Sequence, residues 1–138
     1  MDFFLDSRLE NDSFKVIQLK CSECRLMNNK NFLWLILIPR RHDKKDWIDL
    51  IEEDQIELLK EINQCGRVLK NFNHPIFLPC EKLNIASLGN VVSQLHIHII
   101  SRNSKDIAWP KPVWGVGADF FYTQEEKENI VMALQAAF

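Results

Sequence analysis

The residues best suited to chemistry are a glutamine and two histidines at alternate positions of the segment Gln94-Leu95-His96-Ile97-His98-Ile99-Ile100. In a strand, Gln94, His96 and His98 project from one face, about 7 Å apart, while the aliphatic residues between them pack on the core. A neutral imidazole is a nucleophile or base at physiological pH, because its unperturbed pKa is about 6.5. The spacing is therefore compatible with a site in which one histidine reacts while its neighbour and nearby amides bind an anion.

Two other interpretations fit the same spacing. The segment is compatible with the solvent-facing side of an edge strand, on which a histidine pair has no chemical role. A metal site would use His96 and His98 as two ligands, but the segment contains no Asp, Glu or Cys, so His42 or His74 would have to supply a third. The spacing alone leaves the three interpretations open.

Cys21 and Cys24 form a C-x-x-C pair, a spacing that can bind zinc or act as a redox couple. The other cysteines, Cys65 and Cys80, do not form the second paired spacing that a structural zinc site requires. A thioredoxin-like pair opens a helix, whereas this one is followed by Arg25-Leu26-Met27 and a polar turn. The sequence therefore favours ordinary reduced core or surface cysteines.

The elements that would position the histidines follow from the hydrophobic pattern. Apolar residues recur every three or four positions over 53–72, which predicts a long helix, and the capping box Thr123-Gln124-Glu125-Glu126 opens a last one. Strands are predicted over 14–19, 25–27, 34–38, 82–86 and 91–100. Several strands with one long helix between them, and no regular alternation, predict an α+β domain on an antiparallel sheet.

Composition excludes several classes of protein. The 138 residues suit a single domain, 1–138, and 46% of them are hydrophobic, enough for a core without a disulfide or structural metal. A net charge of −2 argues against a protein that coats a nucleic-acid polymer or an anionic membrane. The longest apolar run, 32–38, is far short of the about 20 residues of a membrane helix. The N-terminus has no secretory pattern, so we expect a cytoplasmic protein with no membrane partner.

The segment 94–100 resembles the motif of the histidine triad (HIT) superfamily, His-φ-His-φ-His-φ-φ with φ apolar, with Gln94 in place of the first histidine. The stretches 34–42, 83–85, Gly89-Asn90 and Ser101-Arg102 are similar to family segments in the expected order, and Asp106 with 108–115 resembles a bacterial branch. The resemblance spans roughly residues 10 to 120. It implies a five-stranded antiparallel sheet with one long helix and a C-terminal helix.

The resemblance implies nucleotide chemistry at an α-phosphate, on substrates such as dinucleoside polyphosphates. His96 corresponds to the nucleophile that forms a transient nucleotidyl-histidine, with its second ring nitrogen held by a backbone carbonyl. His98 would contact phosphoryl oxygens or the leaving group, Asn90 the phosphate and Asn84 the nucleotide, and His42 would pack behind the triad. No cofactor or protein-bound metal is implied, and the expected assembly is a homodimer that pairs its sheets.

Two positions depart from the family pattern. Gln94 replaces the first histidine; its amide still donates and accepts, so it is expected to contribute to substrate binding, with an altered rate or specificity. Val91 stands where some relatives carry a hydroxyl residue near the leaving group, which favours phosphoanhydride over phosphoramidate substrates. The rival prediction is a nucleotide-binding module without catalysis.

Trp109 and Trp114 lie in the proline-bearing stretch after the motif. Each is compatible with stacking on a base or capping a site, and equally with anchoring the packing of this segment. The basic residues of 40–45 are compatible with guiding a polyphosphate or with a solvated turn. The sequence does not choose between these alternatives.

Overall fold

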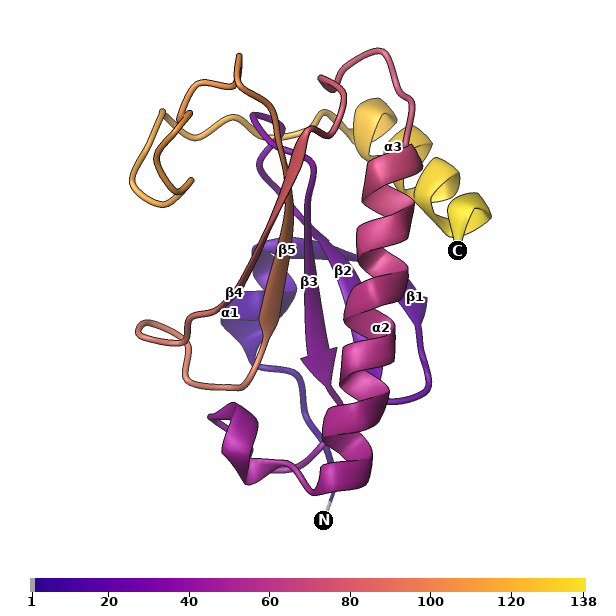
Figure 1. Cartoon of the computed structure of the whole chain (residues 1–138), viewed down its shortest axis with the longest axis vertical. Helices are drawn as coiled ribbons and strands as arrows, with labels where there is room; N and C mark the ends of the chain where they lie inside the picture. Colours follow the sequence, from indigo (N-terminus) through magenta and orange to yellow (C-terminus); the bar gives the residue numbers. More distant parts are fainter. Residues whose placement is uncertain (1) are drawn as a thin grey trace.

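The computed structural model describes residues 2–138 and is built on one antiparallel sheet with the strand order β1-β2-β3-β5-β4 (Figure 1). The strands are β1 (Ser13–Gln18), β2 (Ser22–Met27), β3 (Trp34–Pro39), β4 (Lys82–Ser87) and β5 (Ile97–Arg102). The predicted α+β class with a five-stranded antiparallel sheet is confirmed.

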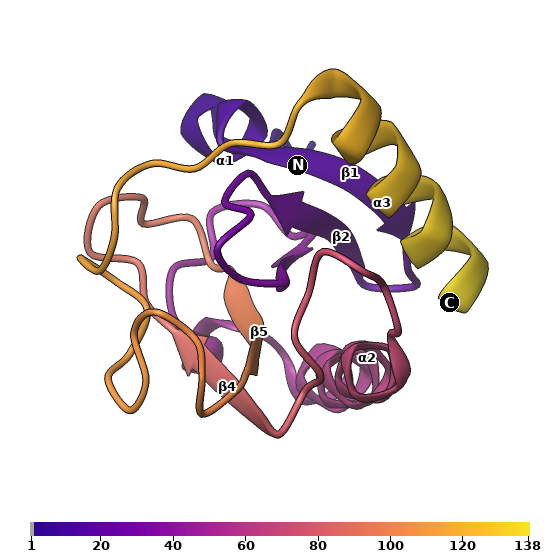
Figure 2. The same ribbon diagram turned by 90° about the horizontal axis from the view of Figure 1, so that it is seen from above.

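Three α-helices and a short 3-10 helix (Trp47–Asp49) complete the fold. The long helix α2 (Glu52–Asn71) and the C-terminal helix α3 (Gln124–Ala137) lie on one side of the sheet, and α1 (Ser7–Asn11) lies on the other (Figure 2). The predicted capping box opens α3, since Thr123 Oγ1 accepts from the Glu126 N–H at 3.1 Å and Glu126 Oε1 accepts from the Thr123 N–H at 2.9 Å. Helix α1 was not predicted from the sequence.

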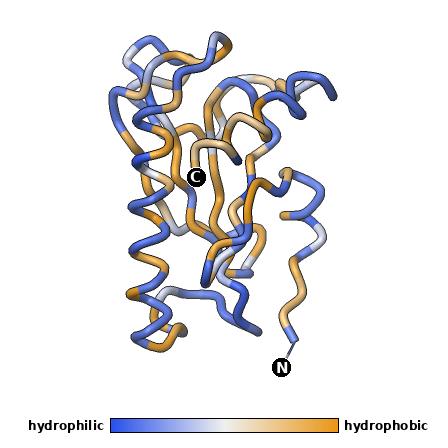
Figure 3. The backbone as a smooth tube through the Cα atoms, turned by 90° about the vertical axis from the view of Figure 1, so that its right-hand side faces the viewer, coloured by the Kyte–Doolittle hydropathy of each residue, from blue (hydrophilic) through white to orange (hydrophobic). Residues whose placement is uncertain are grey.

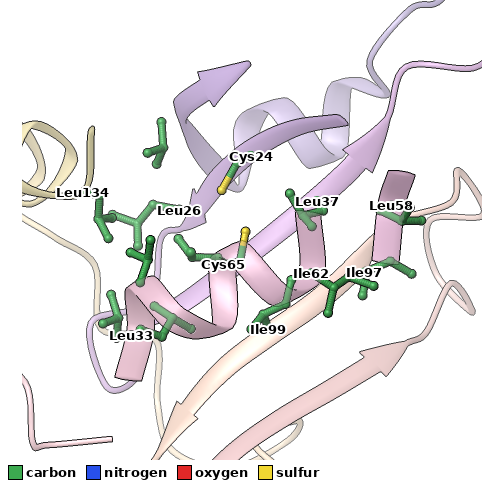
Figure 4. Close-up of a cluster of buried hydrophobic side chains, with 14 of the residues drawn as sticks. Cys24, Leu26, Leu33, Leu37, Leu58, Ile62, Cys65, Ile97, Ile99 and Leu134 are labelled. Atoms are coloured by element: carbon green, nitrogen blue, oxygen red, sulfur yellow. The ribbon is translucent and has the colours of Figure 1, made fainter. Parts of the chain in front are cut away.

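The central strand β3 is buried on both faces because its side chains are apolar throughout. Leu35 and Leu37 face the helices, in a core that includes Cys24, Cys65 and Leu134 (Figure 4). Trp34, Ile36 and Ile38 face a second cluster formed with α1 and the segment after β5. In Figure 3 the central strands are mainly hydrophobic, whereas hydrophilic and hydrophobic residues alternate along α2. Both faces of the central strands are therefore covered by other elements, and this packing restricts the movement of β5.

One predicted strand was misplaced. The sequence predicted a strand over 91–100, but β5 spans Ile97–Arg102 and residues 91–96 form a loop. Ile97 pairs with both Leu37 and Ser87, and the chain leaves the sheet directly after Ser87, so earlier residues have no strand beside them on that side. At the other end, pairing with Lys82 extends β5 to Arg102. Apolar, β-branched residues do not make a strand without partners for their N–H and C=O groups.

Candidate active site

His96 and His98 lie side by side at the start of β5. His98 is the second residue of the strand and His96 immediately precedes it. Their rings meet edge to face with centroids 4.9 Å apart, and the residues are only 6% and 4% exposed. Both line a cavity of about 450 Å³. The structure therefore brings the two predicted catalytic histidines together on one wall of a ligand-sized cavity.

The hydrogen bond of His96 determines which of its ring nitrogens carries the proton. The Nδ1 atom lies 2.6 Å from the backbone oxygen of Gln94. A carbonyl oxygen only accepts, so Nδ1 carries the hydrogen and donates it. In the neutral ring the Nε2 atom then keeps a free lone pair, which is the form of imidazole that attacks an electrophile.

His98 has the opposite tautomer. The indole Nε1–H of Trp34 donates to His98 Nδ1 at 3.0 Å, so this nitrogen carries no hydrogen and the proton is on Nε2. Burial, followed by the proximity of His96, lowers the pKa of His98 to about 4, which keeps the ring neutral at physiological pH. The two rings thus provide a bare Nε2 and an Nε2–H, a nucleophile beside a hydrogen-bond donor.

Apart from Met27 of β2 and Trp34 of β3, the remaining walls of the cavity come from three separate segments. They are Leu9 and Asp12 around α1, the loop 88–92 before the histidines, and Trp114 in the segment after β5. Trp114 meets His98 edge to face with centroids 5.0 Å apart and Trp34 in the same way at 5.7 Å. Of the two tryptophans that the sequence left open, Trp114 belongs to the site, and Trp109 does not line it.

A second cavity, of about 510 Å³, adjoins the first and shares Asp12, Met27 and Trp34 with it. Its further lining is polar with one aromatic ring: Asn11, Asn28, Asn29, Asp119 and Phe121. Amide and carboxylate groups beside aromatic surface suit the hydroxyls and the base of a nucleoside. Together the two cavities extend well beyond the space a single phosphate would fill.

Of the predicted substrate-binding residues, Asn90 lines the histidine cavity, and Asn84 and Gln94 do not. Asn84 lies on β4, where its Oδ1 accepts from the guanidinium of the fully buried Arg102 at 2.7 Å. The Gln94 side-chain amide is bound to backbone atoms of residues 4 and 6. The structure therefore places Asn84 and Gln94 in supporting positions instead of on the cavity surface.

His42 does not pack behind the triad as expected. It is exposed in the turn after β3, and Trp34 occupies the position behind His98. Sequence reasoning did not find this role of Trp34, because the residue was interpreted as one more apolar residue of a buried strand. One available signal was its indole N–H, which needs an acceptor when the residue is buried. Nothing in the local sequence around Leu9 and Asp12 indicated that these residues line the cavity.

In the part of the chain that the structure describes, the histidines and cysteines do not form the cluster that a metal site would need. Within residues 2–138, no three His, Cys, Asp or Glu side chains are grouped to hold a metal ion. Cys21 and Cys24 are fully buried, and the sulfur of Cys24 faces Cys65 in the main core (Figure 4). The hydrogen bond with this second thiol, followed by burial, raises the pKa of the Cys24 thiol well above its usual value, so Cys24 is an unreactive core residue.

The fold and the paired histidines define a class of protein, and comparison identifies it. A family model described as HIT domain matches residues 8–105, so the chain belongs to the HIT family. A histidine triad protein from Bradyrhizobium japonicum is 41% identical, with a TM-score of 0.91 over 99% of this chain and 98% of that one. A HIT protein from Sinorhizobium meliloti is 38% identical, with a TM-score of 0.91 over 99% and 97%.

A third solved structure, a histidine triad protein from Marinobacter aquaeolei, is 34% identical with a TM-score of 0.88 over 99% of this chain and 96% of that one. Among curated proteins none matches the chain significantly. No helix within residues 2–138 is long and apolar enough to span a membrane. The family and its fold are thus established, whereas the reaction is to be inferred from the site.

Proposed function

We propose that this chain is a HIT-type nucleotide hydrolase or nucleotidyl transferase that acts at the α-phosphate of a dinucleoside polyphosphate-like substrate. The observation that carries the proposal is the pair of opposite tautomers at His96 and His98, side by side in one cavity. One ring supplies a lone pair and the other supplies a hydrogen, and both are held before a substrate arrives. Such positioning is what phosphoryl transfer requires of a protein.

The reaction consists of two displacements. His96 Nε2 attacks the α-phosphorus, the P–N bond forms, and the bond from phosphorus to the bridging oxygen breaks, so that the leaving phosphate takes the electron pair. Water or another acceptor then attacks the same phosphorus, the P–N bond breaks, and the acceptor loses a proton. The His98 Nε2–H donates to a phosphoryl oxygen, on which negative charge increases during each attack.

The loop 88–92 favours a phosphoanhydride substrate. Val91 is 84% exposed at the edge of the histidine cavity and has no hydroxyl with which to protonate a departing amine. A polyphosphate leaving group is a weak base and departs without a proton, so it does not need this donor. Asn90 lies on the same loop and lines the cavity, and on this proposal its amide donates to the transferred phosphate.

The adjoining cavity is assigned to the nucleoside. Asp12 accepts hydrogen bonds from sugar hydroxyls, while Asn28 and Asn29 provide amides for the base or sugar. Trp34 belongs to both cavities and therefore lies where the nucleoside meets the α-phosphate. On this assignment the nucleoside and the reacting phosphorus are held by different segments of the chain.

We also propose the homodimer that the family resemblance implied. Strand β4 is an edge of the sheet, so its outer N–H and C=O groups have no strand partner. Large apolar side chains are exposed nearby, with Ile85 on β4 at 53% and Leu59 and Ile56 on α2 at 53% and 50%. Pairing of two β4 edges would satisfy the strand and cover these residues. Light scattering coupled to gel filtration should give twice the chain mass of 16.2 kDa.

The test of the reaction is His96→Ala, assayed with diadenosine tetraphosphate. Loss of the nucleophile is expected to reduce turnover by at least about a thousandfold. His74→Ala, a histidine at the end of α2 that does not line either cavity, is the matched control and should retain the wild-type rate. Rapid quenching without acid should add the mass of one nucleotidyl group to His96 of the wild-type protein.

Two results would contradict the proposal. Full activity in His96→Ala would exclude this histidine as the nucleophile. AMP could instead raise the melting temperature of the wild-type protein while no substrate of a nucleotide panel turns over. The chain would then be a nucleotide-binding module without catalysis, which is the alternative prediction from the sequence.

A further inference from the structure

The side chain of Gln94 binds a segment 90 residues away in the sequence. Its Oε1 accepts from the backbone N–H of Asp6 at 2.9 Å, and its Nε2 donates to the backbone oxygen of Phe4 at 2.8 Å. A carboxamide presents an acceptor and a donor side by side, as a neighbouring strand would, and both are used here. We call residues 3–12, which comprise this extended piece, α1 and Asp12, the N-terminal arm.

The arm forms one side of the histidine cavity. Leu9 is buried against Trp34 and Val92 in the second apolar cluster, and Leu9 and Asp12 both line the cavity. Arg8 donates to the backbone oxygen of Val91 at 3.2 Å, which ties the arm to the loop before the histidines. The arm is thus attached where substrate would bind, and Gln94 makes two of the hydrogen bonds that hold it.

We propose that Gln94 is a positioning residue that latches the N-terminal arm over the cavity, so that it sets the affinity for the nucleoside and takes no part in phosphate chemistry. The role in affinity rests on the proposed nucleotide function, whereas the latch itself does not. The same residue also holds His96, because its backbone oxygen accepts from His96 Nδ1. Its side chain therefore orders the arm and its main chain orders the nucleophile.

This role explains what a glutamine does at a position where the family motif has a histidine. The two nitrogens of an imidazole point in divergent directions, so one ring cannot bond both the Phe4 oxygen and the Asp6 N–H as the planar amide does. Gln94→His, which restores the motif, is therefore expected to loosen the arm instead of improving the enzyme.

The first experiment measures the latch without any nucleotide. In Gln94→Met, which keeps the length of the side chain and removes both amide groups, hydrogen exchange of the backbone amides of residues 4–12 should be at least about tenfold faster. Gln135→Ala is the matched control, because the Gln135 amide donates to the Val16 oxygen outside the cavity. Unchanged exchange in Gln94→Met would overturn the latch.

The second experiment is a double-mutant cycle read out as affinity for AMP. Asp6→Pro removes the N–H that Gln94 accepts, and the φ of −57° at Asp6 suits a proline. Gln94→Met is expected to weaken AMP binding about fivefold, with kcat within about twofold, and in that background Asp6→Pro should have no larger effect than Asp6→Ala. Asp6→Ala keeps the N–H and controls for loss of the carboxylate.

The cycle separates the latch from direct substrate contact. If the effect of Asp6→Pro, measured relative to Asp6→Ala, multiplies with that of Gln94→Met, or if Gln94→Met lowers kcat more than affinity, Gln94 acts on the substrate itself and the proposal is wrong. A wild-type protein that binds no nucleotide overturns the proposed function and with it the role in affinity. In that case the exchange measurement still decides whether Gln94 holds the arm.

Discussion

The two sides of the histidine cavity are built in different ways. On one side, which we call the strand wall, Trp34 of β3 and His98 of β5 are held by ladders on both edges and by fully or nearly fully buried residues behind them. On the other, the loop wall of Leu9, Asp12, the loop 88–92 and Trp114 is attached through a few side-chain hydrogen bonds. His98 is on the strand wall, and the ring of His96, the proposed nucleophile, meets it edge to face directly before β5.

The difference between the two walls corresponds to a difference in what each has to do. A nucleophile has to be placed accurately, and paired strands with a packed core provide that accuracy. A binding surface has to admit and release a ligand, and loops held by a few bonds open at a lower free-energy cost. Substitutions in the strand wall should therefore affect kcat, and those in the loop wall should affect ligand affinity.

The largest expected effect is on the anchor of the loop wall, the buried Arg102. Its guanidinium donates to both carboxylate oxygens of Asp106, at 2.8 and 3.1 Å, and to the Lys111 oxygen at 2.8 Å, which holds the segment leading to Trp114. Arg102→Met should lower the free energy of unfolding by about 3–5 kcal/mol, because it leaves a buried carboxylate without its partner. Urea denaturation measures this.

The matched control is Arg67→Met on the exposed side of α2, for which a change within about 0.5 kcal/mol is expected. Adding Asp106→Ala to Arg102→Met should recover part of the loss, because no unpaired carboxylate remains. Equal stability of the Arg102 and Arg67 variants would show that the loop wall does not depend on this anchor.

Next in size is the pH dependence of stability that His98 confers on the strand wall. In the unfolded chain this residue binds a proton near its unperturbed pKa of about 6.5, whereas in the folded protein its pKa is lowered to about 4. The unfolded state therefore gains protons first, and the free energy of unfolding should fall by about 3 kcal/mol as the pH drops from about 6.5 to about 4.

His98→Gln removes this titration and keeps a hydrogen-bond acceptor for Trp34. Urea denaturation at several pH values should show a shallower decline for the variant than for the wild type, with the carboxylates titrating equally in both. Parallel curves for the two proteins would mean that His98 titrates normally in the folded state.

A smaller effect is expected from Trp34→Phe, which removes the N–H that donates to His98 Nδ1. The buried nitrogen loses its partner and the tautomer of His98 is no longer fixed, so kcat should fall about tenfold. Trp47→Phe, in the 3-10 helix outside both cavities, is the control. An increase in KM at unchanged kcat would place the role of Trp34 in binding instead.

The smallest effect concerns Trp114, which belongs to the loop wall. Trp114→Ala should raise KM about fivefold with little change in kcat, because it removes an aromatic surface of the cavity and no reacting group. Trp109→Ala provides the comparison, since Trp109 lies in the same segment but does not line the cavity. Equal changes in KM for the two variants would remove the distinction between them.

Prediction from the sequence was accurate where local pattern and long-range packing agree. The helix predicted over 53–72 is α2 at 52–71, and the capping box begins α3 where expected. The start of β5 was predicted six residues early, because the partners that end the ladder, Leu37 and Ser87, lie far away in the sequence. A strand ends where its neighbours end, and the pattern within the strand does not contain that information.

The same reason explains why the surroundings of two predicted site residues differ from those expected. Asn84 was expected to bind the nucleotide, yet its oxygen accepts from Arg102, whose burial is set by the loop that folds over it. His42 was expected behind the triad, and Trp34 from the neighbouring strand fills that place. In each case the residue type was compatible with the role, and the three-dimensional neighbours decided whether the role was available.

By itself the sequence determined the fold class, the family and the pair His96 and His98, because alternation along the chain places both rings on one face whatever surrounds them. Only the tertiary structure decided which nitrogen of His98 carries the proton, since that depends on the Trp34 indole that the fold brings beside it, whereas the backbone carbonyl expected at His96 is that of Gln94, two residues away. It likewise decided that the Gln94 amide faces the N-terminal arm. Spacing specifies the direction of the side chains, whereas the tautomer of His98 is specified by a hydrogen-bond partner that is distant in the sequence.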